Sequence, residues 1–380
     1  MLSNLKVLDF TGLLPGPFAT QKLADMGAAV IRIESHRHPD LVRAMPPYAE
    51  GESLTFAYLN RSKRSLALDL KQPQAVEIIQ RLILSHDIVL EQFRPGVMAR
   101  LGLDYDSLRV INPRLIYCSI TGYGQTGEHS HKAGHDLNYL ARSGLLAVGK
   151  PGPLPTQLAD LSGAQHAVMG ILAAVIQRLQ TGVGQYIDVS MTDVALSLQP
   201  LAIANAMQAG ENPCSATGLL IGGSFYDCYE TSDQRYLSVG CLEPKFFQRF
   251  VAALGHPEWA PLVTQLNPAV QGALKENIAH IFKQKTLAAW TDFFAPLDVC
   301  VEPALTLTEA LAAAQAMQIE VATVQGKTQQ QLACPLRFGA APSHDIFAAP
   351  PLGFHSEAIL RELGYEDEKI AQWQANGVVA

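Results

Sequence analysis

The chain has 380 residues, of which 48% are hydrophobic and 17% are charged, and its formal net charge is −7. This length and composition allow one large hydrophobic core or two separate ones. Because nucleic acids and anionic membranes bind to basic surfaces, the acidic balance argues against both as partners.

The cysteines and the first residues indicate a cytoplasmic protein. The six cysteines are dispersed and form no CxxC pair, which is typical of a reduced protein. The opening segment, MLSNLKVLDFTG, lacks the basic and apolar stretches of a secretory signal. No uninterrupted apolar run reaches about 18 residues, so we expect no membrane span.

The first 125 residues alternate short apolar strands with helices, and from Asp160 onward a helix, a strand and a further helix follow. Strands are predicted at 6–10, 28–34, 65–70, 87–93, 114–120 and 185–191. Helices are predicted at 18–26, at 73–85, from Asp160 to the TGVG segment at 181–184, and from the end of the last strand to about 208. This alternation is typical of an α/β domain with a mostly parallel, doubly wound sheet.

The pattern changes after residue 224. Residues 224–242 alternate polar and apolar side chains around a polar turn, as a β-hairpin does. Helices are predicted at 244–254, 269–283 and 285–294, so we interpret 225–325 as a smaller α+β domain. After Cys334 we expect a proline-rich extended segment, followed by helices at 356–363 and 367–375.

Two motifs have a functional and a structural interpretation. GLLPGP at 12–17 follows the first strand, where a dinucleotide-binding fold has GxGxxG, but its glycine spacing differs and two prolines stiffen it. The phrase HSHKAGHD contains His129, His131 and His135, yet its spacing fits no established zinc pattern. We therefore expect neither a nicotinamide or flavin site nor a metal site.

Basic residues are concentrated where strand ends and loops are expected to converge. They either belong to solvated loops or form the seat of a phosphorylated ligand. The residues are Arg32, Arg37, Arg43, Arg61, Lys63, Arg64 and Arg94.

His135 and Asp160 are each predicted at the start of a helix. Asp160 could be only an N-cap, since Asp is a favoured cap, and His135 could be a histidine satisfied under a loop. Alternatively, the two form an acid–base pair, and the amides at the helix start after Asp160 stabilise a developing enolate oxygen.

At these residues the sequence resembles the class III CoA-transferase superfamily (CaiB/BaiF type). The similarity covers nearly the whole chain, through NRSKRSLALDLK, EQFRPGV, LGLDYDSL, NPRLIYCSITGYGQTG, TGVGQYIDVSM and PLGFHSEAILRELGY. The resemblance implies a Rossmann-like large domain made from both chain ends, 1–224 and 326–380, with the small domain at 225–325. It also implies an intertwined homodimer whose active site lies between the large domain of one subunit and the small domain of the other.

Within the superfamily, the chain is most similar to the α-methylacyl-CoA racemase branch. It has AGHDLNY, QLAD, GGSFYDCYE and LEPKFF, and it has no run of glycines after Gly240, where better-known transferases have one. By resemblance, His135 and Asp160 match the acid–base pair and Glu243 the residue that assists the histidine. The expected substrate and CoA contacts are Arg37, Leu68, Asp69, Arg94, Asp136, Tyr139 and Tyr226.

The chain also departs from the pattern. Ser35 and His36 stand where relatives offer an arginine toward the adenine, with Arg37 displaced, and Thr156 replaces a frequent asparagine.

These matches predict a racemase that inverts the 2-methyl-bearing α-carbon of acyl-CoA thioesters by two-base proton transfer through an enolate. No metal and no cofactor beyond the CoA moiety of the substrate is expected. One alternative is a CoA-transferase in which Asp160 forms a mixed anhydride. Another is a CoA-thioester binding protein without catalysis.

Overall fold

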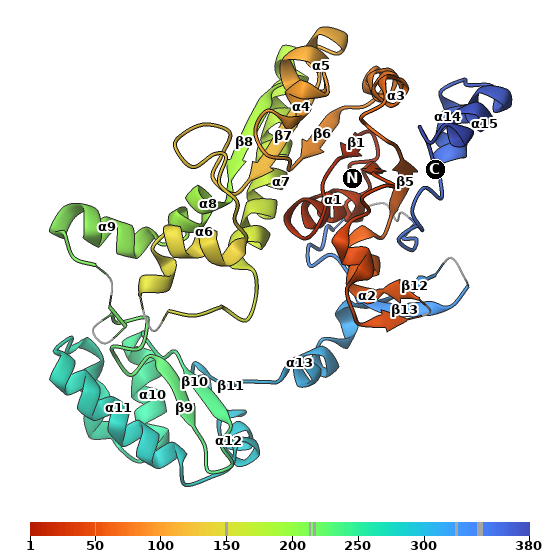
Figure 1. Cartoon of the computed structure of the whole chain (residues 1–380). Helices are drawn as coiled ribbons and strands as arrows, with labels where there is room; N and C mark the ends of the chain where they lie inside the picture. Colours follow the sequence, from red (N-terminus) through yellow and green to blue (C-terminus); the bar gives the residue numbers. More distant parts are fainter. Residues whose placement is uncertain (50, 149–150, 213, 216–217, 324–325, 340–344) are drawn as a thin grey trace. The chain divides into compact units, whose positions relative to one another are not determined.

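A computed structural model describes residues 1–49, 51–148, 151–212, 214–215, 218–323, 326–339 and 345–380. It comprises two compact units (Figure 1). The first contains Met1–Leu145, Gly152–Leu198 and Ala316–Ala380, and the second contains Leu146–Pro151 and Gln199–Gln315.

These boundaries differ from those expected at 224/225 and 325/326. The predicted apolar helix to 208 is interrupted, so that α8 (Met191–Ser197) ends before Pro200 begins α9 (Pro200–Ala209). Toward the C-terminus, β12 (Gln318–Ala322) pairs with β13 (Thr328–Leu332), whose Gln331 accepts a hydrogen bond from buried Arg61 of the first unit. This tertiary contact assigns the hairpin to the first unit, and local sequence patterns do not show it.

A six-stranded parallel sheet forms the centre of the first unit and confirms the predicted α/β class. Its order is β5-β2-β1-β6-β7-β8. The strands are β1 (Lys6–Asp9), β2 (Ala29–Glu34), β5 (Lys63–Ala67), β6 (Ile88–Glu91), β7 (Ile116–Thr121) and β8 (Tyr186–Ser190). β5 begins two residues before the predicted start, which was placed at Ser65 because the preceding residues, Lys63 and Arg64, are basic.

Helices cover both faces of this sheet, as in a doubly wound fold. One face packs in a single core with α3 (Pro73–Ile83), α5 (Tyr105–Ile111), α14 (Ser356–Glu362) and α15 (Asp367–Ala375). The alternate residues of the strands, such as Val7 and Ile88, are equally buried and face the other way. On that side α1 (Pro15–Asp25) packs against α7 (Leu158–Thr181), which contacts β7 and β8.

Helix α7 is long and apolar enough, by length and composition, to cross a membrane. In this unit it packs against α1, α8 and the sheet, as a central core helix does. It ends at Gly182, whose φ of 76° is the left-handed conformation that a glycine adopts readily, and this confirms the predicted end of the helix.

The C-terminal segment covers the free edge of β5. The N–H of Ala380 donates to the Ala67 carbonyl at 3.1 Å, and the N–H of Asp69 donates to the Val378 carbonyl at 3.0 Å. Helix α14 packs on the same strand, and Figure 1 shows α14, α15 and the chain end beside β5. Both ends of the chain thus build the first unit.

Shorter elements complete the first unit. They are a 3₁₀ turn at Leu41–Ala44, β3 (Tyr48–Ala49), β4 (Glu52–Ser53), α2 (Leu54–Asn60), α4 (Val97–Arg100), α6 (Asp136–Arg142) and a 3₁₀ turn at Gln315–Met317 that spans the boundary. The expected extended segment after Cys334 has no regular element at 335–339 and 345–355, and its residues 340–344 lie outside the described residues.

The second unit has a small antiparallel sheet in the order β11-β10-β9. The predicted hairpin is confirmed by β9 (Asp227–Glu230) and β10 (Tyr236–Val239). The sheet shares an aromatic-rich core with the helices that follow it, because Phe247, Phe250 and Phe282 are fully buried. The other elements are α10 (Pro244–Ala253), a 3₁₀ segment at Pro257–Thr264, α11 (Pro268–Phe282), α12 (Leu287–Phe294), β11 (Val301–Pro303) and α13 (Leu307–Ala313).

Candidate active site

A cavity of about 640 Å³ lies at the carboxyl ends of the parallel strands in the first unit. Its walls come from the loop after β1 (13–15), the loop after β6 (92–95), the end of β7 (120–123), Met191 after β8, and the starts of α6 and α7. The strand order reverses between β1 and β6, and open α/β sheets bind ligands in the crevice at such a point.

The cavity brings together His135 and Asp160, as the sequence predicted. His135 is the N-cap residue of α6, and its backbone N–H donates to the Asn138 side-chain oxygen at 3.1 Å. Asp160 is not the N-cap of α7, since that position is Gln157, and Asp160 lies in the first turn. Asp160 therefore lies at a helix start, as predicted, and the alternative in which it serves only as the N-cap does not hold.

Asp136 supplies the cap that α7 lacks. Its Oδ1 atom accepts the N–H of Ala159 at 2.7 Å and the N–H of Asp160 at 3.2 Å. The N–H of Leu161 already donates to the Gln157 carbonyl. The expectation that amides after Asp160 hold an enolate is therefore wrong, because each of them is engaged within the helix.

The environment of Asp160 favours its protonated form. Burial raises the pKa of its carboxyl to about 7, and the negative charge of Asp136 adds to the increase. Burial also raises the pKa of Tyr139 to about 12, with a further increase from the nearby Asp160 carboxylate. A carboxyl with a pKa near 7 can both donate and accept a proton at neutral pH.

Two glycines leave room for the Tyr139 ring in the cavity wall. A Cβ on Gly122 would come within 2.3 Å of the tyrosine ring, and one on Gly134 within 2.7 Å. The Tyr139 hydroxyl donates to the Gly134 carbonyl, and its ring packs edge-on against Tyr123 at 5.2 Å between centroids. The glycine before His135 therefore lets an aromatic ring support the loop that carries the histidine.

Arg94 lies on the loop after β6 and lines the same cavity. Its positive charge counteracts part of the increase in the pKa of Tyr139. The loop is anchored from beneath, because the buried Glu91 carboxylate accepts the Phe93 N–H at 2.8 Å. Burial raises the pKa of Glu91 to about 7.

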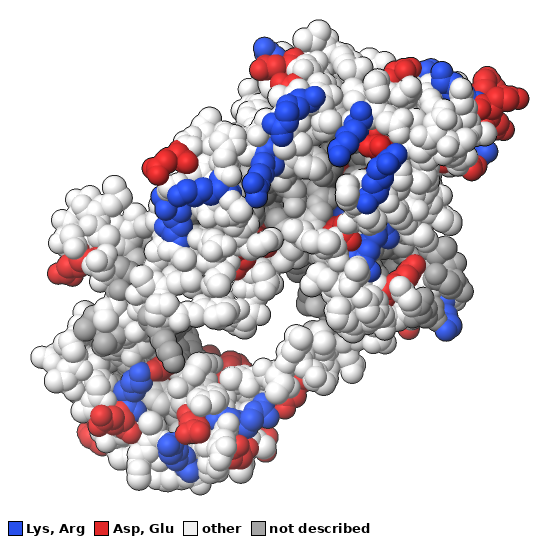
Figure 2. Space-filling model, viewed as in Figure 1, with Lys and Arg blue, Asp and Glu red and all other residues white. Residues whose placement is uncertain are grey.

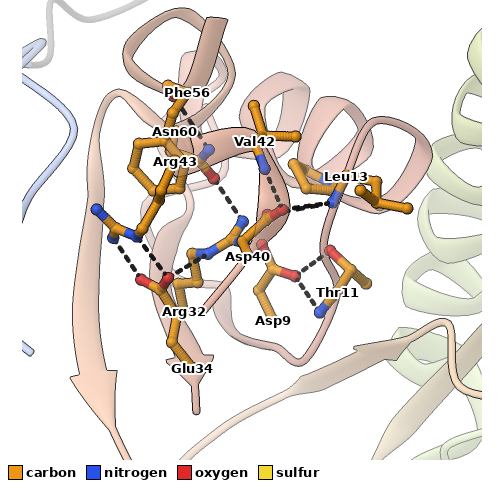
Figure 3. Close-up of polar contacts among 12 residues, drawn as sticks. Asp9, Thr11, Leu13, Arg32, Glu34, Asp40, Val42, Arg43, Phe56 and Asn60 are labelled. Atoms are coloured by element: carbon orange, nitrogen blue, oxygen red, sulfur yellow. Dashed lines mark hydrogen bonds and ion pairs between the residues drawn. The ribbon is translucent and has the colours of Figure 1, made fainter. Parts of the chain in front are cut away.

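Most of the predicted basic cluster forms ion pairs with carboxylates of the first unit, and Figure 3 shows those of Arg32 and Arg43. Arg32 pairs with Asp40, and Arg43 makes two hydrogen bonds to Glu34. Elsewhere in the cluster, Arg61 pairs with Asp25, Lys63 with Asp9 and Arg64 with Glu362. Of the two interpretations left open for the cluster, these pairs disfavour a ligand seat at these five residues, because each already has a carboxylate partner within the chain.

The ion-pair network around Asp40 also positions two residues of the cavity wall. The Asp40 carboxylate accepts the N–H of Leu13 at 3.1 Å and of Val42 at 3.0 Å, and both residues line the cavity. At the start of α1, Pro15 and Pro17 have no N–H, and the N–H of Gly16 donates to Gln92. The first three positions of this helix therefore offer no free N–H to a phosphate group.

The remaining predicted residues lie away from the cavity wall. Arg37 is half exposed and pairs with Asp69 at 2.8 Å. Leu68 is fully buried in the core, so its side chain cannot contact a ligand. Figure 2 shows Lys and Arg side chains on the viewed face of the first unit.

Glu243 and Tyr226 belong to the second unit. Glu243 is an exposed N-cap residue of α10, and Tyr226 precedes β9.

Sequence reasoning missed most of the wall, including the polar residues Thr121, Tyr123 and Lys132. The Thr121 hydroxyl is buried and has no hydrogen-bond partner among the described residues. Its position at the carboxyl end of β7 was the signal that could have identified it. Among the described residues, no group of three His, Cys, Asp or Glu side chains is arranged to hold a metal ion.

The sequence profile of the CoA-transferase family III matches residues 2–356. The chain belongs to this family. A solved family III structure, a CAIB/BAIF family protein from Brucella suis, superposes with a TM-score of 0.81 at 30% identity, covering 95% of this chain and 99% of that one.

Family III relatives similar to this chain catalyse two kinds of reaction. The α-methylacyl-CoA racemases of Homo sapiens and Mus musculus are 33% and 36% identical, over 100% of this chain and 97% of each relative. The succinate–glutarate CoA-transferase of Agrobacterium fabrum is 32% identical, with 95% of each chain covered. These identities are too similar to separate the racemase from the transferase reaction.

Proposed function

We propose that this family III enzyme is an acyl-CoA racemase that inverts the α-carbon of 2-methyl-branched acyl-CoA thioesters. The observation that carries the proposal is the presence of His135 and Asp160 in one cavity, with Asp160 protonatable near neutral pH. His135 takes the α-proton from one face, and Asp160 gives a proton to the opposite face of the enolate. The roles reverse for the other enantiomer.

The enolate oxygen needs hydrogen-bond donors. The N–H groups of Asp136 and Leu137 at the start of α6 have no acceptor among the described residues, whereas those at the start of α7 are occupied. We assign the oxygen to the α6 side of the cavity. Losing one such donor typically costs about 3–4 kcal/mol of transition-state stabilisation.

The reaction moves only protons, so we propose that it uses no metal and no cofactor beyond the CoA moiety of the substrate. Arg94 is our candidate for contacting the anionic CoA moiety, because it lines the cavity and has no ion-pair partner among the described residues.

We also propose a cytoplasmic homodimer in which Glu243 of one copy orients His135 of the other. Complementation tests this arrangement. If the dimer exists, mixing His135→Ala with Glu243→Ala subunits regenerates one intact site in each mixed dimer, and that dimer regains about half the activity. A fully active monomer in sedimentation, or no complementation, would contradict it.

The decisive test follows the α-proton of each enantiomer of a 2-methylacyl-CoA by NMR in D₂O, without an acceptor acid. The wild type should exchange the proton and invert the centre. His135→Ala and Asp160→Ala should each abolish inversion. Because each base faces one side of the carbon, any residual exchange should be confined to opposite enantiomers in the two variants. His131→Ala is the matched control, since His131 is exposed and outside the cavity wall.

A CoA-transferase is the second candidate, favoured by the transferase relative at 32% identity and by the Asp160 carboxyl facing the cavity. It predicts no exchange without an acceptor, and a mixed anhydride on Asp160 that hydroxylamine traps. A binding protein without catalysis predicts tight CoA-thioester binding with neither reaction.

A further inference from the structure

We infer that Asp136 is the positioning residue of the site, because its carboxylate ties the start of α7, which carries Asp160, to the start of α6, which carries His135. The inference deepens the proposed function and rests on it for its catalytic consequence. Its structural part depends only on the two hydrogen bonds from Ala159 and Asp160.

The first step concerns the α7 N-terminus. The N-cap residue, Gln157, makes no side-chain capping bond, the Leu158 N–H donates to the Thr156 carbonyl, and the helix ladder begins at Leu161. The two intervening N–H groups donate to Asp136 alone. A residue more than twenty positions earlier in the chain therefore replaces the local cap.

The second step concerns geometry. Asp136 follows His135 directly, and its side chain holds the backbone nitrogen of Asp160 itself. The backbone of His135 is fixed as well, because its N–H donates to the side-chain oxygen of Asn138. The two proton-transfer groups are thus attached to the two ends of one hydrogen-bonded bridge. A shift of either helix start would change their separation, and catalysis is sensitive to such shifts.

The third step concerns charge. A free α7 N-terminus would stabilise the Asp160 carboxylate, because helix N-termini carry partial positive charge. The Asp136 carboxylate neutralises that charge and repels a second negative charge, so its effect on the pKa of Asp160 adds to that of burial. The other titratable or charged groups around the cavity are His135 and Tyr139 on the α6 side, Lys132 just before it, Tyr123 after β7, and Arg94 on the loop after β6.

Two variants separate geometry from charge. Asp136→Asn keeps an oxygen acceptor and removes the charge, whereas Asp136→Ala removes both. Asp106→Asn is the matched control, because Asp106 is an exposed aspartate in the first turn of α5. The readouts are the thermal midpoint, the carboxyl titration of Asp160 by ¹³C NMR, assigned with Asp160→Asn, and the pH profile of α-proton exchange.

Asp136→Asn should lower the pKa of Asp160 by about one pH unit and shift the matching limb of the exchange profile by the same amount, with little change in the thermal midpoint. Asp136→Ala should also lower kcat by at least about tenfold with little change in KM, and Asn should rescue most of this loss. The control should match the wild type.

An unchanged Asp160 titration in both variants, or equal loss of kcat in Asn and Ala with no shift in the pH profile, would overturn the inference. The titration needs no substrate. If the wild type exchanges no α-proton, the proposed function fails, while a titration shift in Asp136→Asn still supports the bridge.

Discussion

The carboxylate of Asp136 accepts the backbone N–H of Asp160 at 3.2 Å, so two acidic residues at the starts of different helices are joined directly. One acid caps a helix, and the other is left protonatable inside the cavity. Their contact accounts both for the position of Asp160 and for part of its raised pKa.

Asp160 should destabilise the protein at high pH. Its folded-state pKa, about 7, lies above that of an unfolded aspartate, so the native state binds the extra proton and stability falls as pH rises toward 7. Asp160→Asn should therefore increase stability at pH 8 by about 2 kcal/mol and have little effect at pH 4. Thermal unfolding of both proteins across this range checks the prediction. A midpoint difference that does not vary with pH would contradict it.

The glycines beside Tyr139 should not tolerate a side chain. Gly122→Ala and Gly134→Ala would press a methyl group into the ring, at 2.3 and 2.7 Å, and should destabilise the protein by about 1–3 kcal/mol. Gly272→Ala is the control, for which we expect an increase in stability. It lies inside α11 with open space around its Cβ, so alanine should stabilise that helix by about 1 kcal/mol. Differential scanning calorimetry measures all three changes.

Lys63 and Asp9 should depend on each other for their place in the core. Both are fully buried and 3.3 Å apart. Lys63→Met leaves the Asp9 carboxylate without its nearest cation and should cost about 3–5 kcal/mol. The double variant Lys63→Met, Asp9→Asn should recover much of this loss. Urea unfolding of the four proteins gives the coupling energy, and additive losses would show that the pair does not interact.

Arg94 should contribute to thioester affinity. Arg94→Gln removes a cation from the cavity wall and should raise the dissociation constant for an acyl-CoA by about tenfold or more. Isothermal titration checks this. Arg109→Gln is the control, since Arg109 is an exposed arginine paired with Asp106. Equal effects of the two substitutions would mean that Arg94 acts only through the overall charge.

The sheet was predictable from the sequence because its strands are short apolar runs that strand–helix alternation marks off. The roles of charged residues were less predictable. Arg32 and Lys63 follow the pattern of a ligand site, but both side chains are buried and pair with Asp40 and Asp9, which lie elsewhere in the chain. The helix start at Asp160 was visible locally, whereas its cap, Asp136, depends on a tertiary contact.

The polar hairpin of β12 and β13 escaped prediction for a related reason. Gln329, Gln330 and Gln331 have little intrinsic preference for a strand. Their place in the fold depends on pairing, and on the contact of Gln331 with Arg61.

The cover on the β5 edge also sets an order of assembly during synthesis. Residues 345–380, which hydrogen-bond to that edge and pack on it, are translated after every residue of the second unit. All residues of the second unit can therefore be synthesised while β5, the edge strand of the first unit's sheet, is still unpaired on one side. An unpaired strand edge is a template for association with other chains. The nascent sheet thus keeps an unpaired edge, and with it a risk of aggregation, until residues 345–380 have been made.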